Sequence, residues 1–531
     1  MSRRTSPVDV VIVGGGHNGL VAAAYLARAG RHVILLEASH QLGGAAVSEE
    51  LAPGYVAPTG AHILDAWPRA IERDLRLRKR GLRPAVRAVP TVALDTGGRH
   101  IMLRGPRRQR QSSLAAWSPQ DAEAYAKFQK ELARQANLLR TIVQHPLPKA
   151  GHGKSWAQRG RDAGLQGRAS LFGRHRLRRL LQSLPSSLAD EIDGRFSTDL
   201  LKGALGLEAV CGQAISPRDP GSFFQLIYRE AMRAGHRQTY PKGGMGALSR
   251  ALVSAAQGYG AQLREHAPVE KILIEEGRAV GVCLQDGTEI YAHAVLSTIN
   301  VKQSVQGLLG PTHLDAGLAT RVTQIRQTGT VAKVNLALDG LPAFRPFRQG
   351  SPLIHGSRLL IAPDLRAFDA AFSTFKRGEP GATPLMELVI PSVHDPLLCP
   401  AGQHVMSVLV HYVPYRITGG WDDAAKDRLL NTVVETLGLY APDIESRIVA
   451  ADALTPHDIE SRFGLPEGDW AHGQMAPDQL FQFRPAPGLA HYETPVDGLY
   501  LGGAGTHPGG GLTGLPGKFA AQAILSKGRA S

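Results

Sequence analysis

The N-terminal segment carries the pattern that most restricts the folds open to this chain. A short run of mostly β-branched residues, Val8–Val13, precedes glycines at 14, 16 and 19 and an apolar stretch typical of a helix through Ala29. A second apolar run, His32–Leu36, ends at Glu37. A buried strand, a G-x-G-x-x-G turn, a helix and a second strand ending in an acid predict a dinucleotide-binding unit of a parallel sheet.

Each residue of this fingerprint has a mechanical role in such a unit. Gly14 makes the tight turn, Gly16 lets the backbone approach a pyrophosphate, and Gly19 lets the helix pack closely on the strand. The free N–H groups and the dipole of the helix N-terminus attract phosphate. Glu37 is placed to accept hydrogen bonds from a ribose diol, and its charge would repel the 2′-phosphate of NADP.

Two further glycine-rich segments indicate that the dinucleotide is FAD. Gly43 and Gly44 would bring a second loop against the pyrophosphate, which an NAD-binding domain does not need. Near the C-terminus, residues 498–501 are typical of a buried strand, and the stretch 502–511 leads into a helix from about Thr513. The N-terminus of that helix would face the flavin N1/C2=O region, where negative charge develops on reduction. The predicted FAD contacts are Gly14, Gly16, Asn18, Gly19, Glu37, Ala38, Gly43, Gly44, Ala45, Val269, Gly503, Gly505, Leu512 and Thr513.

These segments resemble the phytoene desaturase-related flavoproteins. The residues that carry the resemblance are 14–37, 43–55, 240–248, 294–297, 332–338 and 503–517. Within that family, the chain is similar to the group of pyridine nucleotide-disulphide oxidoreductase domain-containing protein 2 and the bacterial flavin-dependent carotenoid ketolases. The resemblance implies an FAD-dependent oxidoreductase that acts on a lipophilic, carotenoid or isoprenoid, substrate. Ala45 stands where phytoene desaturases usually carry Arg, which argues against phytoene itself.

The separated halves of the cofactor site predict the domain organisation. At 531 residues the chain exceeds one ordinary core. We expect an α/β fold in which a discontinuous Rossmann-like FAD-binding domain carries an inserted α+β substrate domain. The FAD-binding domain would comprise residues 1–100, 240–300 and 486–531. Residues 101–239 would form a helical insertion at a membrane or substrate entrance, and 301–485 a substrate domain with an antiparallel sheet above the flavin.

The chain is basic, with a formal net charge of +14. Much of the excess lies in 99–110 and 154–179. Within 168–184, leucines at 177, 180, 181 and 184 alternate with arginines, so a helix there would be apolar on one side and cationic on the other. That helix suits peripheral contact with an anionic membrane, and it equally suits a solvated helix whose apolar side belongs to the core. No recognition motif accompanies the charge, so nucleic-acid binding is not expected.

Several further patterns bear on compartment and chemistry. Met1–Pro7 leaves no room for a signal peptide, and no run reaches the length of a spanning helix. We therefore expect a cytoplasmic protein, at most peripheral on the inner face of a membrane. Cys211, Cys283 and Cys399 are far apart and form no C-x-x-C, so a redox-active disulphide is not expected. The histidine spacing matches no metal-site pattern, and no metal is expected.

The chain contains a single dinucleotide fingerprint, because Gly243–Gly246 lacks both the spacing and an acid-ended strand. We therefore expect the flavin to take hydride from an organic substrate and to pass electrons to O₂ or a quinone. His507, inside the C-terminal glycine-rich segment, is the predicted catalytic residue, and His62 is a second candidate. Lys518 is placed either to balance charge on the reduced flavin or to lie on the helix surface.

Three functional classes remain open from the sequence. The first is a dehydrogenase, desaturase or oxidase of a lipophilic substrate, and the second is ketolase-like oxygenation of a carotenoid. The third is a flavoprotein that organises a membrane-associated complex with little turnover. Amine oxidation is disfavoured, because residues 502–518 supply no aromatic pair to enclose an amine beside the flavin.

Overall fold

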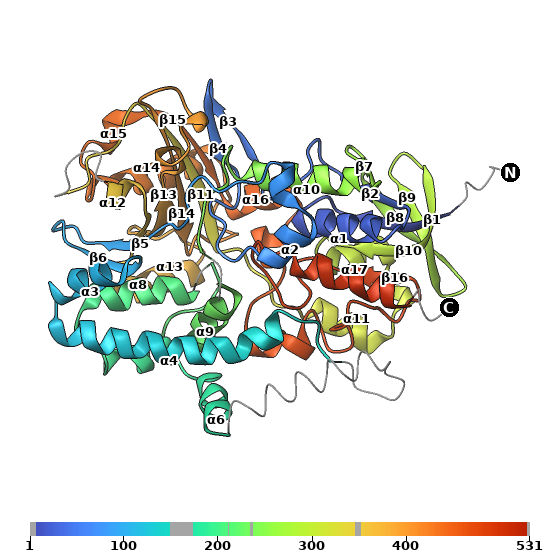
Figure 1. Cartoon of the computed structure of the whole chain (residues 1–531), viewed down its shortest axis with the longest axis horizontal. Coiled ribbons are helices and arrows are strands. Elements are labelled where there is room, and N and C mark those ends of the chain that lie inside the picture. The colour runs from blue at the N-terminus through green and yellow to red at the C-terminus, as the bar shows by residue number, and fades with distance from the viewer. Residues whose placement is uncertain (1–6, 149–173, 211, 234–236, 346–351, 528–531) are drawn as a thin grey trace.

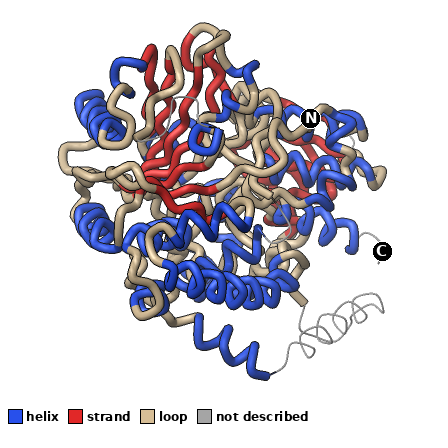
Figure 2. Tube along the Cα trace, turned by 60° about the vertical axis from the view of Figure 1, so that its left-hand side comes forward, coloured by secondary structure: helices blue, strands red, loops and turns tan. Residues whose placement is uncertain are grey.

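The computed structural model describes residues 7–148, 174–210, 212–233, 237–345 and 352–527. Within these residues the chain forms two seven-stranded sheets and one β-hairpin. The two sheets lie side by side, on the right and the left of Figure 1, with a layer of helices along the lower left. Figure 2 shows the same two groups of strands, with most of the helices on their outer sides.

The first sheet holds the dinucleotide fingerprint. Its strand order is β7 (Gln262–Arg264), β2 (Val33–Leu36), β1 (Val8–Val13), β10 (Glu289–Ser297), β9 (Arg278–Leu284) and β8 (Val269–Glu275), and β16 (Leu499–Leu501) pairs with the second half of β10. β7, β2, β1, β10 and β16 are parallel, whereas β9 pairs antiparallel with the first half of β10. The C-terminal strand thus joins the same parallel sheet as the N-terminal one, and the predicted Rossmann-like α/β fold is confirmed.

Three helices cover one face of the first sheet. They are α1 (His17–Arg28), α10 (Gly246–Gly258) and α17 (Leu515–Lys527). Val10 and Ile12 of β1 pack against them through Leu20, Leu252 and Phe519. The alternate residues of β1 pack on the other face against the β8–β9 hairpin, because successive side chains of a strand point to opposite faces.

The second sheet is mainly antiparallel, as predicted for the segment 301–485. Its order is β15 (Ile448–Leu454), β11 (Val331–Leu338), β14 (His404–His411), β13 (Leu385–Val389), β12 (Arg358–Ile361), β5 (Thr91–Leu94) and β6 (His100–Arg104), and only β12–β5 is parallel. One face is apolar and packs on α14 (Asp423–Gly438) through Val334, Val408 and Val433. The separate hairpin is β3 (Ser48–Ala52) and β4 (Tyr55–Pro58), and β4 packs beside β11 and β14.

A layer of helices lies below the second sheet in Figure 1. It comprises α3 (Arg107–Ala115), α4 (Pro119–Val143), α6 (Arg174–Ser183), α7 (Leu188–Asp193), α8 (Asp199–Val210) and α9 (Ser222–Arg233), and α13 (Leu365–Lys376) packs on α8. Ser118 caps α4 by accepting the Asp121 N–H, and Pro119 occupies the first turn, where no N–H is needed. The remaining helices are α2 (Arg69–Asp74), α11 (Ala316–Thr323), α12 (Pro352–His355), α15 (Ile444–Arg447) and α16 (Pro456–Phe463).

The predicted boundary at residue 100 runs through a pair of strands of the second sheet. The predicted boundary places β5 in the FAD-binding domain and most of β6 in the helical insertion. In the structure both strands extend the second sheet beyond β12. The domain boundaries themselves stay a prediction. The described part of 101–239 contains α3, α4 and α6 to α9, and its assignment as an insertion stays a prediction.

The predicted amphipathic helix is only partly described. Residues 168–173 lie outside the described residues, and α6 covers 174–183. Leu180 is buried, whereas Leu181 is 55% exposed and Arg178 and Arg179 are exposed. The leucines therefore divide between core and solvent, because 180 and 181 point about a quarter-turn apart on a helix. In the described ranges, the helices are all too short or too polar to cross a membrane.

Candidate cofactor and catalytic site

The two N-terminal glycine loops meet at the carboxyl end of β1. The Gly43 N–H donates to the Gly15 carbonyl oxygen at 2.9 Å. A Cβ built on Gly44 would lie 3.2 Å from the Gly16 Cα. The Ala61 N–H in turn donates to the Ala45 carbonyl oxygen at 3.0 Å. The second loop therefore lies against the first, as its glycine pair predicts, and it also carries the loop that follows β4.

The protein confines two glycines of the fingerprint and leaves the third open. Gly14 has a φ of +101°, which favours glycine, and a Cβ on Gly19 would lie 2.0 Å from the Gly14 carbonyl oxygen. A Cβ on Gly16 would meet no protein atom within 4 Å. Gly16 also begins α1 without a side-chain cap. Open space beside free first-turn N–H groups fits a pyrophosphate.

The two side chains that follow Gly16 have buried polar atoms without protein partners. In the described residues, His17 Nε2 and Asn18 Oδ1 have no hydrogen-bond partner. Burial lowers the pKa of His17 to about 4, so its ring is neutral at physiological pH. A buried polar atom left unpaired costs about 1–3 kcal/mol. A cofactor rich in hydrogen-bonding groups fits this site, and the contact predicted for Asn18 stays a prediction.

Glu37 lies at the end of β2 and holds the first loop. Its Oε2 accepts the Gly15 N–H at 2.6 Å, and its Oε1 accepts the Ser39 N–H at 2.9 Å. A carboxylate offers about four lone-pair positions, so a ribose diol can still bind. The Ala267 N–H donates to the Glu37 carbonyl oxygen at 2.8 Å, which brings the segment just before β8 to the end of β2. The FAD contacts predicted for Glu37, Ala38 and Val269 stay predictions.

The C-terminal glycine-rich segment packs against the N-terminal unit. A Cβ on Gly503 would lie 2.4 Å from the Thr298 carbonyl oxygen, and one on Gly517 would lie 2.0 Å from the Asn18 carbonyl oxygen. Gly505 is similarly close to Val301, at 2.9 Å. The C-terminal segment therefore packs on α1 and on the residues that follow β10, and Leu512 and Thr513 precede α17. The FAD contacts predicted for this segment stay predictions.

His507 is buried in a structural position. Its Nε2 lies 3.1 Å from the His145 carbonyl oxygen and 3.3 Å from that of Ile142, at the end of α4. Its ring stacks on Phe519, with centroids 6.5 Å apart. Burial lowers the pKa of His507 to about 4 despite these hydrogen bonds. This geometry favours a role in fixing the C-terminal loop to α4, and the catalytic role stays an untested prediction.

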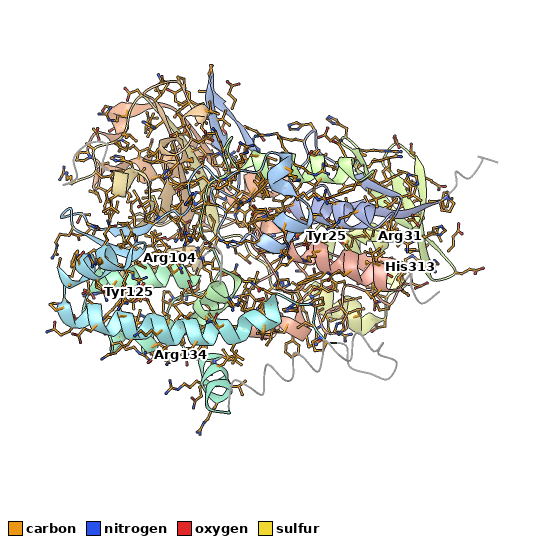
Figure 3. All side chains as sticks on the ribbon, viewed as in Figure 1. Tyr25, Arg31, Arg104, Tyr125, Arg134 and His313 are labelled. Carbon is orange, nitrogen blue, oxygen red and sulfur yellow. The ribbon has the colours of Figure 1, made fainter. Side chains whose placement is uncertain are left out.

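Lys518 lies on the flank of α17, with α1 and α2 as neighbours. Its Nζ is 3.3 Å from Asp74 Oδ2 and 5.3 Å from the centre of the Tyr25 ring, while the Tyr25 hydroxyl donates to the same carboxylate at 2.7 Å. Figure 3 labels Tyr25 at this junction of helices. The Lys518 side chain is only 15% exposed and is paired between helices, so it does not lie free on the helix surface.

The second sheet turns a polar face towards the cofactor loops. Lys333 of β11 and Glu387 of β13 lie on either side of Leu409 in the central strand β14. Asn335 of β11 lies opposite Ser407 of β14. His411 lies two residues after Leu409 on β14. Cross-strand partners and alternate residues share a face. We call Lys333, Asn335, Glu387, Ser407 and His411 the polar face; all five are buried. Asn335 Nδ2 donates to the Pro58 carbonyl oxygen at 3.1 Å, which fixes this face against β4.

His62 reaches the polar face from the loop after β4. Its Nε2 lies 2.9 Å from Glu387 Oε1, and its Nδ1 is buried with no partner in the described residues. Burial and the nearby Lys333 lower the pKa of His62 to about 4, against the pull of Glu387. Burial alone would raise the pKa of Glu387, but Arg358 and His62 hold it well below its usual range. The ionised Glu387 therefore accepts a hydrogen bond from the Nε2–H group of His62. The Nδ1 atom of His62 carries no proton and is left as a hydrogen-bond acceptor.

Lys333 is a site residue that the sequence-based search missed. Its side chain is fully buried, its Nζ has no partner among the described residues, and burial lowers its pKa to about 7. A buried lysine with a lowered pKa beside a cofactor is typical of functional sites. The available signal was a lysine and an asparagine at alternate positions, 333 and 335, of a mainly apolar strand.

A buried ionic network supports the polar face from the side of the helical layer. Arg358 contacts both Glu387 and Glu208, and Glu208 also contacts Arg233. Arg233 pairs with Asp65 at 2.6 Å. The network ends at Arg104, labelled in Figure 3, which pairs with Glu230. Four arginines, counting Arg229, face four carboxylates, so the charges balance and Lys333 lies outside the pairing.

The fold and the site together define a dinucleotide-binding oxidoreductase with a second sheet over its cofactor loops. The family model "Flavin containing amine oxidoreductase" matches residues 19–525, and the chain belongs to this family. It is 35% identical to rat "Pyridine nucleotide-disulfide oxidoreductase domain-containing protein 2", over 97% of this chain and 93% of that one. It is 24% identical to "Phytoene desaturase (lycopene-forming)" of a Paracoccus strain, over 97% of each chain.

The solved structures agree on the fold. An oxidoreductase from Methanosarcina mazei superposes with a TM-score of 0.60 at 18% identity, covering 98% of this chain and 100% of that one. The predicted family resemblance and the FAD cofactor are confirmed by these findings, and the protein is a flavin-dependent oxidoreductase. Within the described residues, histidine, cysteine and acidic side chains form no group that could hold a metal, and Cys283 and Cys399 are free. Cys211 lies outside those residues.

Proposed function

We propose that the protein is an FAD-dependent dehydrogenase, desaturase or oxidase that takes hydride from a lipophilic substrate to flavin N5. One observation supports the apolar substrate: an aromatic cluster lies between the helical layer and the C-terminal loop. Phe224, Tyr228 and Phe481 have ring centroids 5.9–6.3 Å apart. The Tyr228 hydroxyl donates to the Pro508 carbonyl oxygen. Phe224 and Tyr228 are buried in the hydrophobic core, so this apolar packing would keep water away from the C-terminal loop.

The bound flavin would supply the two-electron chemistry, and the chain would supply binding and orientation. Gly16 and the first turn of α1 would hold the pyrophosphate, and Glu37 the ribose. The polar face would orient the reacting end of the substrate, because it is buried and His62 reaches it from the loop that packs on Ala45. The single fingerprint supports O₂ or a quinone as electron acceptor rather than NAD(P)H. A carotenoid or isoprenoid substrate is supported by the 24% identity to a phytoene desaturase.

We further propose peripheral contact with the cytoplasmic face of a membrane through 168–184. Exposed Arg178, Arg179 and Leu181 on α6 support this contact, since cationic and apolar side chains together favour an anionic bilayer. Figure 1 shows α6 standing out from the body of the molecule below α4. Flotation with phosphatidylserine vesicles tests it: the triple variant Arg178→Gln, Arg179→Gln and Leu181→Gln should stay at the bottom of the gradient. Unchanged flotation of this variant would remove the proposal.

Anaerobic mixing with lipid extracts tests the oxidoreductase proposal. Holoenzyme and extract are combined without oxygen, and flavin absorbance is followed. We expect a fraction that contains lipophilic organic molecules to bleach the flavin, and air to restore the colour. Incorporation of labelled O₂ into product would instead indicate ketolase-like oxygenation. A flavin that no lipid fraction reduces would favour the complex-organising role and contradict the proposal.

A further inference from the structure

A small pocket lies where three segments of the chain meet, and no predicted FAD contact lines it. The segments are 64–78, 82–87 and 237–241. Leu64 and Thr239 exchange two main-chain hydrogen bonds, of 2.9 and 3.1 Å, and the Ala85 N–H donates to the Tyr240 carbonyl oxygen at 2.8 Å. Main-chain hydrogen bonds therefore hold the three segments together around the pocket, whose volume is about 110 Å³.

The rim of this pocket is cationic. One acid, Glu72, and five exposed arginines line it: Arg69, Arg78, Arg83, Arg87 and Arg237. Glu72 pairs with Arg78. The other four arginines have no ion pair and no side-chain hydrogen bond with any residue that the structure describes, and we call these four the arginine rim. Like charges around one pocket repel one another, so a bound anion would offset this repulsion.

The floor of the pocket is buried and contains an unused hydrogen-bond donor. Leu64, Trp67 and Leu82 line the pocket and are buried. Trp67 Nε1 is also buried, and it has no hydrogen-bond partner in the described part of the chain. An indole N–H group can only donate. A ligand that is negatively charged and accepts hydrogen bonds fits both the rim and this donor.

Charge and size favour a phosphate group among the common anions. A carboxylate carries a single charge, and one arginine can hold it through two parallel hydrogen bonds. A phosphate monoester carries about −1.5 to −2 charge at pH 7 and has three strong acceptor oxygens, which planar guanidinium groups match in geometry. The pocket is much smaller than the roughly 300–1,000 Å³ that encloses a whole organic ligand. Only the phosphate group would enter it, and the rest of the ligand would lie outside.

We infer that the arginine rim and Trp67 form a binding site for the phosphate group of a phosphorylated molecule. The arginines supply charge-assisted hydrogen bonds to the phosphate oxygens, and Trp67 Nε1 supplies one further donor. The inference does not depend on the substrate of the flavin. A soluble phosphate ester and the headgroup of a phospholipid present the same oxygens, so either source can supply the group.

Calorimetric titration of the holoenzyme tests the site. FAD is kept bound, so that added phosphate does not occupy the place of the FAD pyrophosphate. Ionic strength is held constant, because salt screens exposed charges. We expect inorganic phosphate to bind saturably and acetate to bind roughly tenfold more weakly or less. A holoenzyme that does not bind phosphate, or binds acetate as tightly, would overturn the inference.

A double variant removes half of the arginine rim. Arg83→Gln with Arg87→Gln should weaken phosphate binding roughly tenfold or more. The unfolding midpoint without phosphate should not fall, because neither side chain loses a partner among the described residues. Arg73→Gln with Lys79→Gln is the matched control: it removes the same charge from exposed positions in the same stretch of chain that do not line the pocket. The control should bind phosphate as wild type does. Equal weakening in the two double variants would show an effect of net charge alone and overturn the site.

Trp67→Phe tests the donor of the floor. The variant keeps an aromatic ring and loses the N–H group, so phosphate binding should weaken roughly tenfold, the loss expected for a donor to a charged acceptor. FAD content and the unfolding midpoint report whether the variant is folded. Unchanged phosphate affinity in a folded Trp67→Phe would overturn the assignment of Trp67.

Two further probes distinguish the sources of the phosphate group. Glycerol 3-phosphate is the soluble probe, and phosphatidylcholine vesicles that contain phosphatidic acid are the lipid probe. Vesicles are tested in a protein that already carries the three glutamines on α6, so that the two membrane proposals are measured apart. Cosedimentation that is lost with Arg83→Gln and Arg87→Gln would assign the site to a phospholipid headgroup. Binding of glycerol 3-phosphate without such cosedimentation would assign it to a soluble molecule. If neither probe binds through the arginine rim, the inference is wrong.

Discussion

Replacement of Gly517 by alanine should separate the two ends of the chain. Gly517 lies in the first turn of α17, and a Cβ there would lie 2.0 Å from the Asn18 carbonyl oxygen of α1. That contact must lengthen by more than about 1 Å to reach an ordinary van der Waals distance. A backbone oxygen inside a helix cannot move by changing rotamer, so α17 must shift as a body. We expect a loss of about 3 kcal/mol, at the upper end of the usual cost of overpacking.

Urea unfolding and FAD titration measure this effect. The shift also displaces Asn18 from the first turn of α1, so FAD affinity should fall along with the free energy of unfolding. Gly438→Ala is the matched control, because Gly438 is helical and a Cβ there meets no atom within 4 Å. That control should be neutral or stabilising by about 0.5–1 kcal/mol. If Gly517→Ala has the same unfolding free energy and the same FAD affinity as wild type, the close packing of α17 on α1 is refuted.

Three further predictions concern the buried groups. Arg358→Met leaves Glu208 and Glu387 without their shared partner, so urea unfolding should show a loss of about 3–5 kcal/mol; an unchanged midpoint would contradict the network. His507→Gln should lower stability by about 1–2 kcal/mol and leave flavin reduction unchanged, whereas a catalytic histidine would cost roughly 100-fold or more in rate. His17, His411 and His507 have pKa values of about 4 in the folded chain against 6.5 as their usual value. As the pH falls, these histidines therefore bind protons in the unfolded chain before they do so in the folded chain. The free energy of unfolding should be constant above about pH 6.5 and should decline towards pH 4, by up to about 3 kcal/mol per histidine. A urea midpoint that does not change over this interval would contradict their burial.

The local part of the fold could be predicted from the sequence. Strand, glycine turn, helix and acid are consecutive at 8–37, so their spacing alone defines the unit, and the contacts of Gly14 and Gly19 agree with the predicted roles. The C-terminal strand was also predicted, because its apolar run and the glycines after it are adjacent. In the structure this strand, β16, pairs with β10 and so joins the same parallel sheet as the N-terminal strands.

The catalytic surroundings could not be predicted in this way. His62, Lys333 and Glu387 are far apart in the sequence, and only the register of β11, β14 and β13 brings them to one face. The glycine-rich neighbours of His507 predict a catalytic position, but the carbonyl groups that bind its ring come from the end of α4. The leucines of α6 matched a helical stripe, yet the helix packs on its neighbours so that Leu180 is buried and Leu181 is not. In each case tertiary contacts decide, and no local pattern encodes them.

We infer that both ends of the chain form one FAD site around the open space at Gly16. A Cβ at this position would meet no protein atom within 4 Å, and Gly16 has an ordinary φ of −66°, so we expect Gly16→Leu to strain the cofactor-free protein little. The direct measurement is FAD content, from the visible spectrum, together with the unfolding midpoint of the cofactor-free protein. We expect wild type to bind one FAD per chain, and Gly16→Leu to bind none with an unchanged cofactor-free midpoint. Stoichiometric FAD in Gly16→Leu would contradict the site.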